Sequence, residues 1–218
     1  MTDSNDFYNS FDNYWGKEKQ EPEPVQFDSG PTKFRTLYMI VIAEIILVAG
    51  GIIGALLEAY TLVQISSLAM LVAGIAYLVV VLKLREYNDL FRVAGLYYLS
   101  KTLIDFFNNN FNVEPFHNLL EILVAVLGVL YIVKFCDGCV QLLKDQDKII
   151  TDSWLSFRYG YVCYSVASIV CSLLAYIPII RVLVVIASII LAVFTIVFFV
   201  WQLRLLKRTD IVLRGGTI

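Results

Sequence analysis

The sequence predicts an all-α integral membrane protein with six transmembrane helices, arranged as three helical hairpins, with N and C termini cytoplasmic. Hydrophobic residues make up 59% of the chain and charged residues 17%, a composition that leaves a soluble domain too little polar surface to cover itself. Six apolar runs follow one another, each about the 20 residues that a helix needs to cross the hydrocarbon core. Lys and Arg fall almost entirely on one side of the resulting topology.

Residues 1–33 are polar and acidic, and we expect them to form a disordered N-terminal tail. They lack the basic start and apolar centre of a signal peptide, so none is expected. The aromatic residues Phe7, Phe11, Tyr14 and Trp15 recur at helical spacing within this tail. The pattern suits a short helix that folds against a groove on a partner, whereas a solvated tail is the simpler interpretation.

The transmembrane domain is predicted over residues 34–208, and a short cytoplasmic tail over residues 209–218. The predicted spans are Leu37–Leu57, Val63–Leu82, Leu90–Asn108, Leu119–Phe135, Tyr161–Ile179 and Val182–Leu203. The third run is the least apolar. If it lay on the membrane surface, the later Lys- and Arg-rich connections would fall outside the cell, against the positive-inside rule. We therefore expect it to span, as part of a multi-pass protein of the cell membrane.

A Phe-Arg dipeptide recurs at the start of the odd-numbered spans, at residues 34–35, 91–92 and 157–158, with offsets of 57 and 66 residues. Tyr98 and Tyr164 both follow the Arg by six residues. Each dipeptide opens an outward helix, which a short linker joins to an inward helix. The repeat predicts hairpin units 34–89, 90–156 and 157–208, related by pseudo-threefold symmetry.

A cluster of polar residues lies within the predicted membrane interior: Glu44, Lys101, Asp105 and Asn108. The last three share one face of the third span because they recur every three or four residues. Glu44 and Lys101 each lie nine residues after the Arg of the repeat, which places both roughly 13 Å into the membrane. We hypothesise an ion pair between them, which either fixes helix register or belongs to a polar pathway for a solute or ion.

Four more polar residues are predicted at the outer face: Glu58, Glu114, His117 and Glu121. His117 and Glu121 are four residues apart at a helix start, a spacing that can direct two ligands at one metal ion. The sequence has a single His, however, and carboxylates at helix starts also complement the helix dipole. We therefore expect no metal site.

The segment Cys136-Asp-Gly-Cys139 is predicted just beyond the fourth span, on the inner side. A CxxC motif can be a redox pair or half of a four-thiolate zinc site, and zinc shared across a dimer is the more plausible of these roles. No second CxxC is present, and Cys163 and Cys171 lie among small residues of the fifth span, where cysteine packs as a small apolar side chain.

The sequence contains none of the common nucleophile, zinc-protease, phosphate-loop or dinucleotide motifs, so we expect no enzyme and no cofactor. No basic, aromatic-interleaved face indicates nucleic acid. The small residues of Gly50-x-x-x-Gly54, and of Ser66, Ala69, Ala73 and Ala76, form faces that another helix can approach closely. The leading interpretation is a membrane scaffold or accessory subunit that contacts the lipid bilayer and binds a protein partner or a second copy. The alternative is a small transporter or channel that uses Glu44, Lys101 and Asp105.

Overall fold

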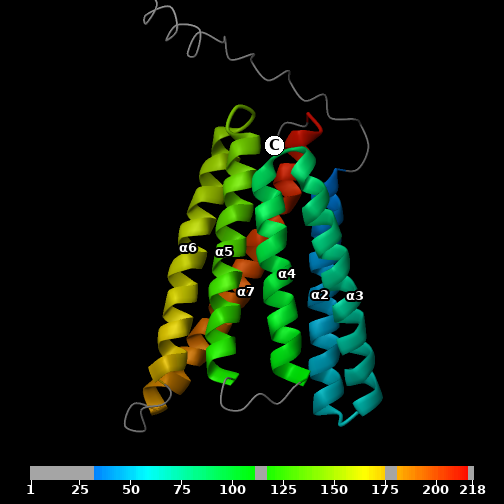
Figure 1. Cartoon of the computed structure of the whole chain (residues 1–218), viewed down its shortest axis with the longest axis vertical. Helices are drawn as coiled ribbons and strands as arrows, with labels where there is room; N and C mark the ends of the chain where they lie inside the picture. Colours follow the sequence, from blue (N-terminus) through cyan, green and yellow to red (C-terminus); the bar gives the residue numbers. More distant parts are fainter. Residues whose placement is uncertain (1–31, 111–116, 175–180, 216–218) are drawn as a thin grey trace, which may run out of the picture. The chain divides into compact units, whose positions relative to one another are not determined.

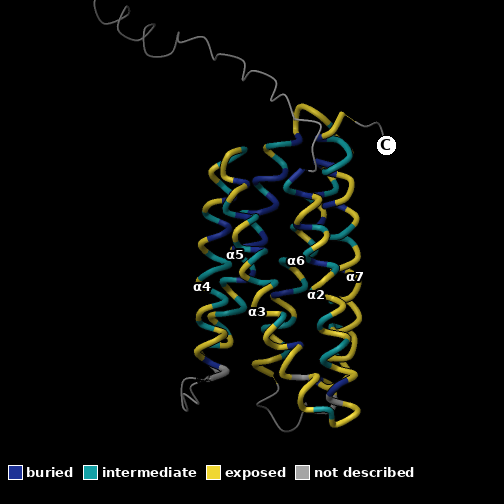
Figure 2. Tube along the Cα trace, turned by 90° about the vertical axis from the view of Figure 1, so that its right-hand side faces the viewer, coloured by how far each residue is buried: buried dark blue, intermediate teal, exposed yellow. Residues whose placement is uncertain are grey.

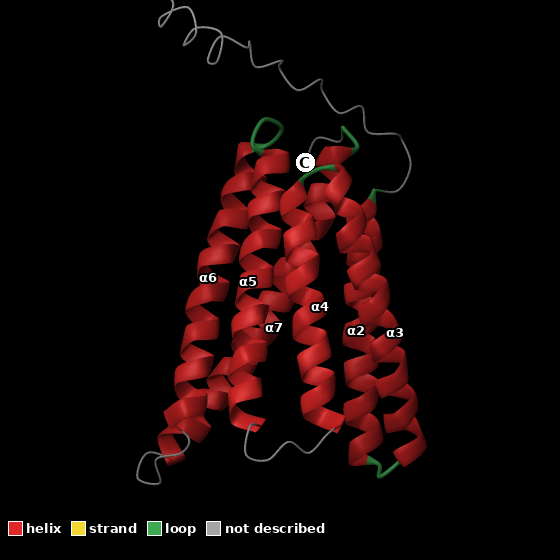
Figure 3. Cartoon of the chain, viewed as in Figure 1, coloured by secondary structure: helices red, strands yellow, loops and turns green. Residues whose placement is uncertain are grey.

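The computed structural model describes residues 32–110, 117–174 and 181–215, and all regular secondary structure in these ranges is helical. Its elements are α2 (Lys33–Leu56), α3 (Tyr60–Lys83), the short 3₁₀ helix η1 (Leu84–Glu86), α4 (Asp89–Asn110), α5 (His117–Leu143), α6 (Lys148–Leu174) and α7 (Arg181–Leu213). The all-α prediction is therefore confirmed for the described part of the chain (Figure 3). The acidic tail, apart from Thr32 and Lys33, lies outside the described residues.

Five of these helices are long and apolar enough to cross a membrane. The qualifying segments are Lys33–Gly54, Tyr60–Glu86, Leu119–Leu143, Lys148–Leu174 and Leu183–Leu213. Such helices indicate a membrane protein. Helix α4 is not among them, because polar residues such as Lys101, Asp105 and Asn108 interrupt its apolar sequence.

The long helices form a closed ring in chain order. Each packs on its neighbour in the sequence, and α7 closes the ring by packing on α2 (Figure 1). The most extensive contacts are those of α4 with α5 and of α2 with α3. This arrangement places one face of every helix toward a common centre.

Large apolar side chains cover the outside of the ring. In α7, for example, Ile189, Val193 and Ile196 are 63%, 57% and 65% exposed. A soluble protein folds largely by removing apolar side chains from water. In lipid, apolar side chains can remain on the surface of the protein. Figure 2 shows that buried residues instead concentrate toward one end of the bundle. This end, where α2 begins, α7 ends and α5 turns into α6, is called the aromatic end below.

The aromatic end is held by a chain of ring contacts that links α2, α4, α5, α6 and α7. The contacts run Phe34–Phe91 (6.2 Å between ring centroids), Phe91–Phe135 (5.5 Å), Phe135–Trp154 (5.8 Å), Trp154–Phe157 (5.9 Å) and Phe157–Trp201 (5.5 Å), all edge to face. Such pairs stabilise beyond the apolar area that they bury. The three phenylalanines of the Phe-Arg repeat all belong to this chain, and each is at most 1% exposed.

The Cys136–Cys139 segment lies inside α5, not beyond it as predicted, because α5 continues to Leu143. Asp137 forms an ion pair with Arg158 of α6. Gly138 faces the ring of Phe91, and a Cβ atom built at Gly138 would lie 2.9–3.1 Å from three ring atoms. The glycine therefore allows α4 and α5 to approach closely at the aromatic end.

We expect Gly138→Ala to destabilise the protein. Its added methyl group would overlap the fully buried Phe91 ring, and overpacking of this kind costs about 1–3 kcal/mol. That cost outweighs the roughly 0.5–1 kcal/mol that alanine gains over glycine within a helix. Thermal unfolding in mild detergent measures the difference.

Gly50→Ala is the matched control for this substitution, since a Cβ atom at Gly50 would meet Ser66 Oγ at 3.6 Å, an ordinary contact. We expect its midpoint temperature to equal or exceed that of the wild type. Equal midpoints for the two variants would show that Phe91 does not confine Gly138.

Candidate functional site

A cavity of about 340 Å³ lies at the centre of the ring of helices. All six long helices contribute to its wall: Val41 and Glu44 from α2, Tyr77 from α3, Tyr98 and Lys101 from α4, Gly128, Tyr131 and Ile132 from α5, Tyr161 and Tyr164 from α6, and Thr195, Phe198, Phe199 and Gln202 from α7. The volume is at the lower end of the roughly 300–1,000 Å³ typical of small-molecule sites. Its wall combines apolar and aromatic surface with hydroxyl, amide and charged groups, as small-molecule sites do.

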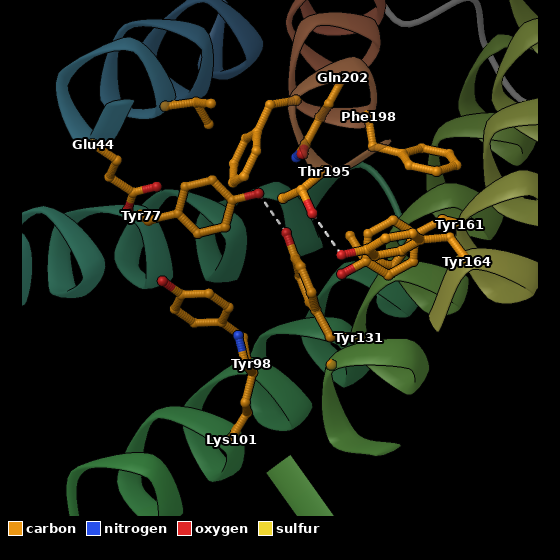
Figure 4. Close-up of a pocket in the computed structure, with 14 residues that line it drawn as sticks. Glu44, Tyr77, Tyr98, Lys101, Tyr131, Tyr161, Tyr164, Thr195, Phe198 and Gln202 are labelled. Atoms are coloured by element: carbon orange, nitrogen blue, oxygen red, sulfur yellow. Dashed lines mark hydrogen bonds between the residues drawn. The ribbon is translucent and has the colours of Figure 1, made fainter. Parts of the chain in front are cut away.

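Glu44 and Lys101 bring opposite charges to this cavity. Both side chains are half-buried and point into it, Glu44 from α2 and Lys101 from α4 (Figure 4). The hydrogen bonds and ion pairs of the described residues include no direct contact between the two side chains. The two groups to which the repeat gave the same depth thus line one cavity without touching each other.

The repeat explains how these residues reach the cavity. Val41, Tyr98 and Tyr164 each lie six residues after the Arg of a Phe-Arg dipeptide, and all three line the wall. Glu44 and Lys101 lie one helical turn further along α2 and α4. The same position of the repeat therefore faces the cavity in α2, α4 and α6.

Gly128 makes room for the lysine. A Cβ atom built on this buried glycine would lie 3.8 Å from Cδ and Cε of Lys101, so the aliphatic stem of the lysine runs across α5 at this point. A larger residue at position 128 would occupy the space of the stem or of the cavity.

Hydroxyl groups line much of the remaining wall. Tyr77 and Tyr131 share a hydrogen bond, and the ring of Tyr98 lies 5.1 Å and 5.3 Å from their rings between centroids. On the α6–α7 side, the Thr195 hydroxyl donates to the backbone oxygen of Leu191 (3.0 Å). The Tyr164 hydroxyl, 2.6 Å away, therefore donates to Thr195 Oγ1.

A second cavity, of about 360 Å³, lies between α6 and α7 on the other side of this Tyr164–Thr195 pair. Both residues line both cavities. Ser168, Cys171 and Ser172 of α6 and Ser188 of α7 also line the second cavity. Polar side chains thus continue along α6 and α7 away from the aromatic end.

Asp105 and Asn108 do not line the central cavity. Asp105 is exposed on α4 and Asn108 is buried, and both make interactions of their own. Of the three residues of the predicted path, Glu44 and Lys101 line the central cavity and Asp105 does not.

The predicted outer-face residues are spread over separate elements. Glu58 is exposed in the turn between α2 and α3, with φ 52°, and Glu121 is exposed on α5, where it lines a small cavity of about 110 Å³. His117 is the first residue of α5, and Glu114 lies outside the described residues. Within the described ranges, no three His, Cys, Asp or Glu side chains are grouped to hold a metal ion.

Cys136 and Cys139 are free thiols, and both are 0% exposed within the bundle. A zinc ion shared between two copies would require α5 to open, because neither thiol reaches the surface. The positions favour a packing role, in which a small side chain fits between closely approaching helices.

Sequence reasoning missed Tyr77, Tyr131, Thr195 and Gln202. The only available signal was the equivalence of Tyr98 and Tyr164 in the repeat, which marks a cavity-facing position on the odd-numbered spans but not on the others. No family model, curated protein or solved structure matches this chain.

Proposed function

We propose that this chain is a multi-pass transporter of the cell membrane that binds a small solute in the central cavity. The observation that carries the proposal is the position of Glu44 and Lys101 on the wall of one cavity to which all six long helices contribute. Charged side chains in a membrane are costly and are usually retained where they face a water-filled space or a pathway. A pair that served only to fix helix register would be expected in direct contact.

The proposal includes α4 as a sixth span. This helix is 22 residues long, which is sufficient to cross the hydrocarbon core, and it packs between α3 and α5. The cavity accounts for its weaker apolar character at Lys101, which faces inward. Six spans would leave both termini on one side of the membrane, and the excess of Lys and Arg on that side favours the cytoplasm. Protease protection of terminal tags in intact cells would check this topology.

The scaffold interpretation has less support from the packing. Ser66 of α3 lies 3.6 Å from the Cβ positions of both Gly50 and Gly51 of α2, so these small-residue faces are used within the bundle. A protein partner or a homo-oligomer remains a prediction, with the apolar outer surface as its remaining site among the described residues. The proposal involves binding and movement of a solute and no covalent step.

Thiol labelling tests whether the cavity is accessible to water. In a background carrying Cys163→Ser and Cys171→Ser, we expect Thr195→Cys to react with a small charged methanethiosulfonate reagent, because Thr195 lines both cavities. Val193→Cys is the control, since Val193 lies on the same helix with 57% of its surface exposed on the outside of the ring, where lipid excludes the reagent. Equal labelling of both variants, or of neither, would contradict the proposal.

A further inference from the structure

We propose that the solute of the central cavity is a small zwitterion, with an ammonium group and a carboxylate on an apolar body, as in an apolar amino acid. This inference rests on the proposed solute-binding function and specifies the class of ligand.

The residues that line the cavity include one acidic and one basic side chain, Glu44 and Lys101. A cation could pair with the carboxylate but would leave the ammonium of Lys101 uncompensated, and an anion would do the reverse. An uncharged solute would compensate neither group. A zwitterion provides a counter-charge for both, and it adds no net charge to a site within the membrane, where excess charge is costly.

The two groups are also arranged as separate binding points. They project from different helices, α2 and α4, and have no direct contact with each other (Figure 4). The cavity volume of about 340 Å³ limits the solute to a small molecule. The space between the charges is therefore suited to a short molecule that carries its own charges at separate positions.

The walls between the charges are mainly apolar. Val41, Ile132 and Phe198 are buried or nearly buried and line the cavity together with tyrosine rings. Gln202 and the hydroxyl of Thr195 are among its few neutral polar groups outside the tyrosines. Apolar side chains and aromatic rings of this kind bind an apolar body that lies between two charged ends.

The lining also disfavours a continuous ion pathway toward the aromatic end. Phe198 stacks on Trp201 at 6.1 Å between ring centroids and packs edge-on against Phe157 at 5.8 Å. Phe157 is 1% exposed. On this side the cavity therefore ends in packed aromatic rings, as suits a binding site in one state of a transporter.

Equilibrium binding to the purified full-length protein tests the inference with defined probes. L-alanine, L-leucine and L-phenylalanine cover a range of sizes. 3-Methylbutylamine and 4-methylpentanoate are leucine without its carboxylate and without its amino group. We expect at least one of the amino acids to bind, and the leucine analogues to bind at least roughly tenfold more weakly than leucine, because each loses a charged contact.

Variants assign the two ends of the ligand. Lys101→Met is expected to weaken amino-acid binding by roughly tenfold or more and to remove the preference for leucine over 3-methylbutylamine, since the carboxylate loses its partner. Glu44→Gln is expected to remove the preference for leucine over 4-methylpentanoate. Lys207→Met and Glu58→Gln are controls with the same chemistry at exposed positions away from the cavity, and they should bind as the wild type does.

The outcomes separate the inference from the function on which it rests. If Thr195→Cys is labelled but none of the three amino acids binds, the zwitterion proposal is wrong and the solute cavity stands. If the labelling fails as well, both proposals fail. Binding of the amine or the acid as tightly as leucine, or binding that neither cavity variant changes, would also overturn the zwitterion proposal.

Discussion

Liposomes that contain the Lys101→Met variant are expected to take up the amino-acid probes roughly tenfold to 100-fold more slowly than liposomes with the wild type, while the variant remains folded. Among the described residues that line the central cavity, Lys101 is the one basic side chain, and the loss of a charge-assisted contact to a ligand costs about 1.5–3 kcal/mol. Methionine keeps the apolar length of the lysine stem that crosses Gly128. Uptake into liposomes and thermal unfolding in detergent are measured on the same preparation.

The combined result distinguishes a ligand-binding lysine from a structural one. If Glu44 and Lys101 only held the helices in register, the double variant Glu44→Gln with Lys101→Met would fold and remain fully active, because the two losses of charge would compensate. A binding role predicts that the double variant folds at least as well as the wild type and is inactive. An active double variant would therefore refute the proposed function of both residues.

The helices could be predicted from the sequence more accurately than their ends. Hydropathy locates the part of a helix that crosses hydrocarbon, so Leu119–Phe135 was predicted where α5 runs from His117 to Leu143. Similarly, α6 begins at Lys148, 13 residues before the predicted span that starts at Tyr161. The helical turns outside the predicted spans are too polar to be recognised by hydropathy. They are nevertheless helical, because side chains such as Ile150 and Trp154 pack in the aromatic end.

The two charges of the site could also be predicted, because charged residues in apolar runs are few and the repeat gave Glu44 and Lys101 the same depth. The fact that they lie apart on a cavity wall, without contact, could not be predicted from the sequence. A cavity forms where side chains from several helices leave space between them. No sequence pattern marks Tyr77, Tyr131 and Thr195 as neighbours around such a space. Asp105 shares a helix face with Lys101 in the sequence, but the central cavity does not extend to it.

Gly128→Leu is expected to abolish probe binding and uptake without destabilising the bundle. A Cβ atom at Gly128 meets only the lysine stem, at 3.8 Å, so a longer side chain extends into the cavity and displaces the ammonium of Lys101. Within about 340 Å³, a leucine side chain removes a substantial part of the space for a ligand. Filling an internal cavity with apolar atoms also adds dispersion contacts, so the midpoint temperature should be unchanged or higher.

Gly128→Ala is the graded control for this substitution. Its single methyl group makes only ordinary contacts with Lys101, so we expect binding to weaken by no more than a few-fold, and the fold to be at least as stable because alanine is the better helix former. The two variants change the same position and differ only in the volume that they add. A transporter that binds its solute elsewhere would tolerate both equally, and wild-type uptake by Gly128→Leu would therefore exclude the central cavity as the binding site.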